Sequence, residues 1–208
     1  DYFDSLLTDN PVGSAAAENG SSMSLIKHRY PLIVVMPVYE DSESARALMH
    51  DLARLGPIPP FVVMVDDGSV RAVPHASMLT EAGLSGEVIH LARNMGHQRA
   101  IATGIAYVAS CREADGVVVM DSDGEDRPEI IPHLIEQLQR GPFDIVVAER
   151  GKRSESLSFR IFYILYRTVF HVMTGQRIRF GNFTALSMSA VRRLAAMQEL
   201  WVHFAASL

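Results

Sequence analysis

The chain has 208 residues, of which 48% are hydrophobic and 21% are charged, as expected for a globular protein with one sizeable core. Its formal net charge of −5 argues against a general affinity for nucleic acid. The single cysteine, Cys111, excludes an intramolecular disulfide framework and fits a reducing cytoplasm. Its apolar, helical context predicts a small core residue.

Residues 1–29 differ from the rest of the chain. Residues 11–24 are rich in Gly, Ser and Ala and lack periodicity, so we predict a flexible leader over 1–29 and a single domain over 30–208. The chain ends directly after an apolar, helix-like stretch, 200–208, which suggests a domain truncated at its C-terminus. No apolar run reaches the roughly 18 residues needed to span a bilayer.

Apolar runs and helical patterns alternate from residue 30 onward. Short runs rich in β-branched residues predict buried strands at 32–36, 61–65, 88–91, 117–120 and 145–148. Helical spacing and helix-start signals predict helices that begin near Asp41, at His97 and at Pro128. This alternation indicates an α/β fold with a mostly parallel sheet and helices on both faces.

Polar residues follow each of the first four predicted strands. In an open parallel sheet such strand ends share one edge, where ligands bind. The clusters are Pro37 to Asp41, Asp66-Asp67-Gly68, Arg93-Asn94 and Asp121-Ser122-Asp123. No G-x-G-x-x-G, G-x-x-x-x-G-K-[ST] or G-x-S-x-G motif is present, which argues against dinucleotide, P-loop and hydrolase sites.

Three carboxylates, Asp121, Asp123 and Glu125, stand two residues apart. They would repel one another unless a cation lies among them, and Mg²⁺ or Mn²⁺ prefers such hard oxygen ligands together with substrate phosphates. The alternative is an acidic helix entry, a role we assign to Asp126 and Glu129 at the start of the next helix.

The ordered motifs Pro37-x-Tyr39, Asp66-Asp67-Gly68-Ser69, Arg93-Asn94-x-Gly96-His97 and Asp121-x-Asp123 resemble those of family 2 glycosyltransferases, over about residues 31–197. Within that family the chain is similar to the polyprenyl-phosphate sugar transferases of the dolichyl-phosphate mannose synthase type. The resemblance implies a three-layer, Rossmann-like GT-A fold. It also implies a metal-dependent, inverting transfer of sugar from a nucleotide-diphosphate sugar, a UDP- or GDP-sugar, to an acceptor such as a polyprenyl phosphate, in bacterial cell-envelope synthesis.

The resemblance also implies residue roles. Asp66 would hydrogen-bond the nucleotide base and Asp67 would shape the turn. The other nucleotide contacts would be Pro37, Tyr39, Asp41, Arg93, Asn94 and Gly96. The family usually reads P-x-Y-N-E, so Asp41 stands where Glu is expected and Glu40 stands at the Asn position.

On the catalytic side, the resemblance implies that Asp121 and Asp123 hold Mg²⁺ or Mn²⁺. Glu125 replaces the Gln of D-x-D-x-Q and could be a third metal ligand, an acceptor-side base, or neither. Arg150 and Arg153 would meet phosphates of donor or acceptor, unless they form a solvated basic turn.

The acceptor stays open. Asn182 occupies a place where relatives often have Asp, and an amide cannot take a proton. An ionised phosphate acceptor needs no strong base, whereas a hydroxyl acceptor does, and the candidates are then Glu125, Asp126 and His97.

A helix predicted over 157–174 has a broad apolar face beside a narrow basic stripe. It could lie at the inner face of the cytoplasmic membrane, pack on the sheet, or contact a second copy of the chain. Close relatives often anchor through C-terminal transmembrane helices, so this chain is either cut before them or a soluble member.

A protein of another class remains as the alternative to the enzyme: a catalytically silent sugar-nucleotide-binding or scaffold protein. A nucleotidyltransferase is disfavoured, because residues 38–41 are acidic rather than Gly-rich and basic.

Overall fold

The computed structural model describes residues 28–148 and 181–208, so Arg150, Arg153 and the predicted helix 157–174 lie outside the described residues. The strands are β1 (Arg29–Tyr30), β2 (Ile33–Val38), β3 (Phe61–Asp66), β4 (Ser85–His90), β5 (Glu113–Ala114), β6 (Val117–Val119), β7 (Ile145–Val147) and β8 (Thr184–Leu186). The helices are α1 (Ser42–Leu52), α2 (Ser77–Glu81), α3 (His97–Cys111), α4 (Ile131–Arg140), α6 (Met188–Ala195) and α7 (Phe204–Ser207). Two 3₁₀ turns accompany them, η2 (Pro128–Ile130) and η3 (Gln198–Trp201).

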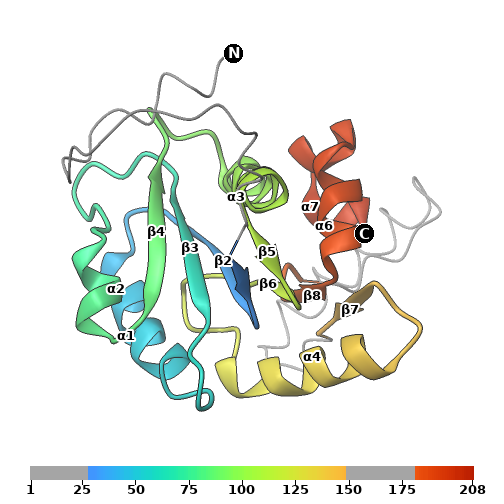
Figure 1. Ribbon diagram of the computed structural model, residues 1–208. Helices are drawn as coiled ribbons and strands as arrows, with labels where there is room; N and C mark the ends of the chain where they lie inside the picture. Colours follow the sequence, from blue (N-terminus) through green and yellow to red (C-terminus); the bar gives the residue numbers. More distant parts are fainter. Residues whose placement is uncertain (1–27, 149–180) are drawn as a thin grey trace, which may run out of the picture.

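A six-stranded sheet in the order β4-β3-β2-β6-β8-β7 forms the centre of the molecule (Figure 1). The pairs β4·β3, β3·β2 and β2·β6 are parallel. The predicted α/β fold with a mostly parallel sheet is therefore confirmed. The antiparallel β8, which lies between β6 and β7, was not predicted. Beside this sheet, β1 and β5 form a small parallel pair.

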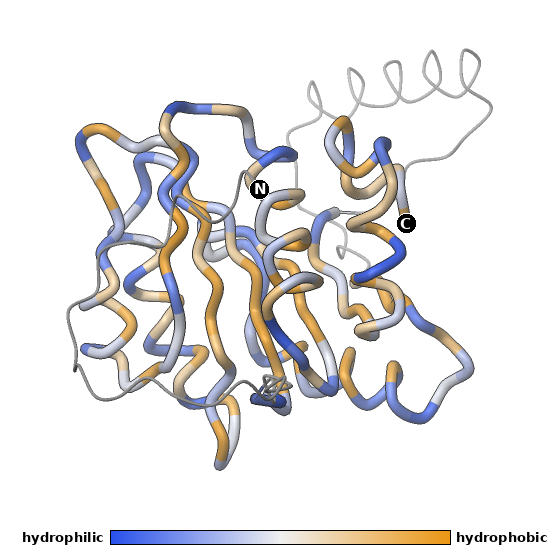
Figure 2. Tube along the Cα trace, turned by 45° about the horizontal axis from the view of Figure 1, so that its top comes forward, coloured by the Kyte–Doolittle hydropathy of each residue, from blue (hydrophilic) through white to orange (hydrophobic). Residues whose placement is uncertain are grey.

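The central strands β2, β3, β6 and β8 are buried on both faces, and successive residues point to opposite cores. Val35 and Val63 face the core under α3 and α6, whereas Val34 and Met36 face the core under α1, α2 and α4. The strands are among the most hydrophobic segments of the fold (Figure 2). Each helix layer removes one sheet face from water, and the expected three layers are thus confirmed.

Helix α3 packs very closely against the sheet. A Cβ atom added to Gly104 would lie 2.5 Å from Val35 Cγ1 and 3.1 Å from Val65 Cγ2, so the position requires a residue without a side chain. This close approach fixes the start of α3, at His97, beside the carboxyl ends of β2 and β3.

Several boundaries differ from the predictions. Strand β4 begins at Ser85, three residues before the predicted start, and the short helix α2 was missed. Pro128 opens the 3₁₀ turn η2, and the α-helix itself begins at Ile131. Cys111 is exposed at the end of α3, so its prediction as a core residue was wrong. Cys111 is the last residue of α3 and lies beyond Val108, the last buried residue of this helix, so it does not reach the core.

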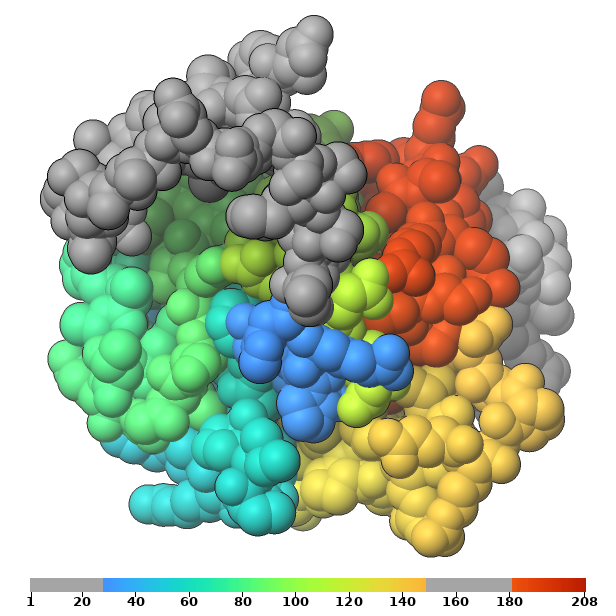
Figure 3. Space-filling model, in the orientation of Figure 1, coloured from blue at the N-terminus to red at the C-terminus, as the bar shows by residue number. Residues whose placement is uncertain are grey.

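The C-terminal elements close one side of the domain. In the space-filling view they lie against the region of α4 (Figure 3), and β8 contacts both α4 and α6. Within the two described ranges, no helix combines the length and the hydrophobicity needed to cross a bilayer.

Candidate functional site

A cleft of about 480 Å³ opens at the carboxyl ends of β2, β3 and β6. It is lined by Pro37, Val38, Tyr39, Asp67, Asn94, Gly96, His97, Asp121, Ser122 and Asp123. Most of the residues predicted for nucleotide and metal binding therefore share one space. Asp41, Asp66, Arg93 and Glu125 do not line it.

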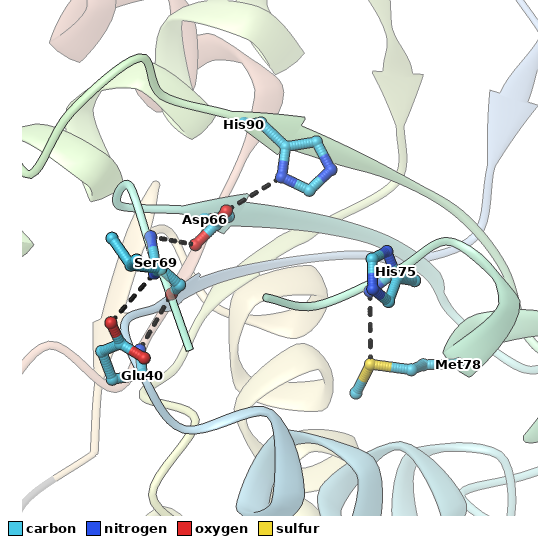
Figure 4. Close-up of polar contacts among 7 residues, drawn as sticks. Glu40, Asp66, Ser69, His75, Met78 and His90 are labelled. Atoms are coloured by element: carbon cyan, nitrogen blue, oxygen red, sulfur yellow. Dashed lines mark hydrogen bonds and ion pairs between the residues drawn. The ribbon is translucent and has the colours of Figure 1, made fainter. Parts of the chain in front are cut away.

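Asp66 ends β3 and is 2% exposed. Its Oδ1 accepts a hydrogen bond from the backbone N–H of Ser69 at 3.0 Å, and its Oδ2 lies 2.9 Å from Nδ1 of His90 (Figure 4). The carboxylate is therefore held in one orientation at the strand end. His90 was not singled out from the sequence, since a lone histidine at a strand end carries no motif.

Asp67, the next residue, links two loops. Its N–H donates to the carbonyl of Val38 at 2.8 Å. Its carboxylate accepts hydrogen bonds from the backbone N–H groups of Met95 at 2.7 Å and Gly96 at 3.0 Å. Because Asp67 is 2% exposed, these bonds satisfy a buried charge and hold the loop after β4 against the end of β3.

Gly68 allows these two loops to touch. Its φ of +75° favours glycine, and an added Cβ would lie 2.5 Å from the backbone nitrogen of Asn94 and closer still to the carbonyl carbon of Arg93. In the Asp66-Asp67-Gly68 motif, the two carboxylates bind backbone N–H groups and the glycine allows the close backbone contact.

Glu40 takes a role that the sequence did not indicate. It has a positive φ of 52°, and its carboxylate accepts hydrogen bonds from the N–H groups of Val70 and Ala72, each at 2.9 Å, and of Arg71 at 3.1 Å. These backbone bonds, chiefly that of Val70, hold the pKa of the Glu40 carboxyl below its ordinary value. Asp41, which the sequence predicts to contact the nucleotide, directly precedes α1 and does not line the cleft.

The acidic motif after β6 forms a local turn. Asp126 is 3% exposed, and its Oδ2 accepts the backbone N–H of Asp121 at 3.0 Å. Asp123 Oδ1 accepts the N–H of Glu125 at 2.9 Å, with Gly124 between them at a φ of 79°. The sequence predicts that Asp126 serves the start of the following helix, and in the structure its carboxylate also binds the backbone of Asp121.

His97 approaches this turn from the start of α3. Its Nε2 lies 3.2 Å from Asp121 Oδ1, and Asn182 Nδ2 lies 2.8 Å from that nitrogen and 3.3 Å from the same Asp121 oxygen. The hydrogen bond with Asp121 raises the pKa of His97, and burial opposes this effect. The chain thus brings together His97 and Asn182, which are 85 positions apart.

The donor set of the cleft fits a divalent cation. Asp121 and Asp123 offer carboxylate oxygens to the same space, and Mg²⁺ commonly uses one or two protein carboxylates plus phosphate and water. In the part of the chain that the structure describes, no group of three or more His, Cys, Asp or Glu side chains is arranged to hold a metal. Glu125, predicted as a third ligand, does not line the cleft.

The sequence was compared with protein families and with known proteins, and the matches are glycosyl transferases. A model of the family described as "Glycosyl transferase family 2" matches residues 33–201. The undecaprenyl-phosphate 4-deoxy-4-formamido-L-arabinose transferase of Pectobacterium carotovorum subsp. carotovorum is 36% identical over 131 residues, covering 60% of this chain and 38% of the relative. The bactoprenol glucosyl transferase of Shigella phage SfV is 25% identical over 177 residues, covering 80% and 55%. The chain therefore spans 38% to 55% of the length of these two relatives.

Among solved structures, glucosyl-3-phosphoglycerate synthase from Mycobacterium tuberculosis, in complex with Mn²⁺, UDP and glucosyl-3-phosphoglycerate, superposes with a TM-score of 0.54. It is 16% identical and covers 77% of this chain and 57% of its own, so the likeness supports the GT-A fold alone. The family match extends over most of the chain, and the chain therefore belongs to glycosyl transferase family 2.

Proposed function

We propose that the cleft binds a nucleotide-diphosphate sugar, a UDP- or GDP-sugar, with Mg²⁺ or Mn²⁺, and that the protein transfers the sugar with inversion to an acceptor. The observation that carries this proposal is the single cleft shared by Tyr39, Asp67, Asn94, Asp121 and Asp123 at the strand ends. Such an edge of a parallel sheet is where ligands bind in α/β proteins.

The nucleoside would occupy the side formed by β2, β3 and the loop after β4. Tyr39 is 51% exposed at the cleft and offers an aromatic face to a base, and Pro37 lies beside it. Asp66 would accept a hydrogen bond from the base. Arg93, Asn94 and Gly96 would border the ribose and phosphates, on a loop that Asp67 holds in place.

The diphosphate would lie toward β6, where Asp121 and Asp123 would hold the cation. When bound, a divalent cation neutralises the negative charge that develops on a leaving diphosphate. The residues of this chain contribute orientation: Asp126 fixes the backbone of Asp121, and His97 and Asn182 contact its carboxylate.

We propose a polyprenyl phosphate as the acceptor. The similarity to undecaprenyl-phosphate and bactoprenol transferases supports this choice. It agrees with Asn182 beside the cleft, because a phosphate acceptor is already ionised and needs no strong base. Arg150 and Arg153 would meet the phosphates, and segment 157–174 would contact the inner face of the membrane, where the acceptor lies.

The test is Asp123→Ala beside Glu129→Ala, an exposed carboxylate that does not line this cleft. With UDP- and GDP-sugars and Mn²⁺, Asp123→Ala should lower donor hydrolysis or transfer by about a hundredfold or more, with an unchanged circular dichroism spectrum. Glu129→Ala should behave like the wild type. Full activity of Asp123→Ala would contradict the metal role, and nucleotide binding without turnover on any acceptor would indicate a silent binding protein.

A further inference from the structure

We propose that His90 is a positioning residue for nucleotide-base recognition, acting by fixing the orientation of the Asp66 carboxylate. This inference rests on the proposed function, in which Asp66 accepts a hydrogen bond from the base. It is carried by the contact of 2.9 Å between His90 Nδ1 and Asp66 Oδ2, drawn in Figure 4.

The sheet itself sets up the contact. Asp66 and His90 are the last residues of the neighbouring parallel strands β3 and β4, and they are paired in register. Side chains that leave adjacent strands at the same register position lie on the same face of the sheet. The pairing therefore depends on two rigid strands and not on a loop.

The pair joins a buried acceptor to an accessible donor. The side chain of Asp66 is 3% exposed, whereas that of His90 is 49% exposed. In the two described ranges, Asp66 is the one polar partner of the imidazole. A carboxylate has about four lone-pair sites, so the bonds from Ser69 and His90 leave acceptor capacity for a base N–H.

The contact is the outer end of a hydrogen-bonded series that runs from the loop after β2, through the loop after β3 and the end of β3, to the end of β4. The N–H of Glu40 donates to Ser69 Oγ at 2.9 Å, the N–H of Ser69 donates to Asp66, and Asp66 contacts His90. Figure 4 shows these four residues in sequence. Without His90, the Asp66 carboxylate would keep, among the described residues, one anchor, the N–H of Ser69 on its Oδ1 side, and could rotate away from the orientation that the base requires.

The hydrogen-bonded series from Glu40 to His90 lies away from the proposed metal ligands, Asp121 and Asp123. Asp121 and Asp123 follow β6, which lies on the opposite side of β2 from β3. Loss of His90 should therefore weaken the contribution of the base to binding and leave the binding of a diphosphate unchanged. A general loss of structure would reduce both.

The experiment is calorimetry on the full chain with Mn²⁺ and three probes: UDP, GDP and inorganic pyrophosphate, which has no base. His90→Ala should weaken binding of the preferred nucleotide about tenfold, the effect of one hydrogen bond to a charged group. His90→Asn, whose side-chain amide offers a donor close to the position of Nδ1, should restore most of this affinity. The matched control is His75→Ala, a neighbouring exposed histidine whose backbone N–H contacts Met78 Sδ (Figure 4).

The outcomes separate the two proposals. A loss for the nucleotide in His90→Ala, with rescue by Asn and unchanged pyrophosphate binding, supports the role of His90. Nucleotide affinity equal to the wild type in His90→Ala, or an equal loss for nucleotide and pyrophosphate, overturns it while the proposed function stands. A wild-type protein that binds neither UDP nor GDP overturns both.

Discussion

The loop after β3 and the acidic turn after β6 border the same cleft but are built differently. Around the first, the carboxylates of Asp66, of Asp67 and of Glu40 from the loop after β2 all accept backbone N–H groups, and Asp67 reaches the loop after β4. In the second, the N–H groups of Asp121 and Glu125 donate to carboxylates within 121–126, and Asp123 and Glu125 are exposed.

This difference separates two uses of a carboxylate. On the β3 side the carboxylates bind backbone N–H groups of the protein itself. They hold this side of the cleft, where we propose that the nucleoside binds, in a fixed shape before any ligand arrives, and such preorganisation lowers the entropic cost of binding. On the β6 side, Asp123 is exposed at the cleft and can serve a ligand. Substitutions should therefore affect stability on the first side and activity on the second.

The largest effect is expected at Gly68. Gly68→Ala adds a Cβ at positive φ against the backbone of Arg93 and Asn94, and should lower the free energy of unfolding by roughly 3 kcal/mol or more. Gly83→Ala is the matched control, since Gly83 has a φ of +77° and no atom within 4 Å of an added Cβ. It should cost about 1–2 kcal/mol, the cost of the conformation alone. Equal losses in denaturant unfolding would show that the loop contact is unimportant.

The next effect compares two aspartates directly. Asp67→Asn should lower the free energy of unfolding by about 2–3 kcal/mol, because an amide cannot accept both N–H groups with the strength of a buried carboxylate. Asp123→Asn, at an exposed position, should change stability by less than about 0.5 kcal/mol while removing metal-dependent turnover. Thermal unfolding and donor hydrolysis, measured on both variants, test the contrast. A stable Asp67→Asn protein would contradict it.

The contribution of Glu40 to the free energy of unfolding should depend on pH. Its pKa is lowered in the folded protein, so its stabilising contribution is present above its unfolded pKa, near 4.5, and is lost as the pH falls through the lower folded value. Glu40→Gln should be less stable than the wild type at pH 7, and the difference should close below pH 4.5. Urea unfolding from pH 7 to pH 3 measures this. If the difference in the free energy of unfolding between wild type and Glu40→Gln did not change with pH, the charge of Glu40 would contribute nothing to stability.

The smallest expected effect is on the titration of His97. Its hydrogen bond with Asp121 raises its pKa, so Asp121→Asn should move this pKa downward in metal-free protein. Imidazole NMR signals followed against pH give the measurement, with the other histidines as internal references. An unchanged titration of His97 would show that the contact with Asp121 does not form in solution.

The parallel part of the fold was accessible from sequence because β2, β3 and β6 are continuous apolar runs. Strand β8 was not, because Thr184–Leu186 is only three residues long and its strand state depends on pairing with β6 and β7. Helix α2, with five residues, is equally short. In both cases tertiary packing decides the local conformation.

The sequence was enough to predict that the candidate site lies at a set of strand ends. It was not enough to predict which side chains contact one another there. The sequence gives no sign that Glu40 would adopt a positive φ and bind residues 70–72, or that His90 would contact Asp66. The first contact joins the loop after β2 to the loop after β3, and the second joins the ends of β3 and β4. Spacing along one strand cannot reveal which of several nearby carboxylates meets a backbone N–H.

The residue before β8, Phe183, is hydrogen-bonded to the residue after β7, Ala148, and this contact bears on how much the chain between them can vary in length. Ala148, at the end of the described part after β7, donates its N–H to the carbonyl of Phe183 at 2.9 Å, just before β8. The described residues on either side of 149–180 are therefore held next to each other, and Asn182, beside Phe183, contacts Asp121 at the cleft. Once two ends are held together, doubling the length between them costs only about 0.6 kcal/mol. Changes in the length of chain between these two ends should therefore leave the register of the sheet beside the cleft unchanged.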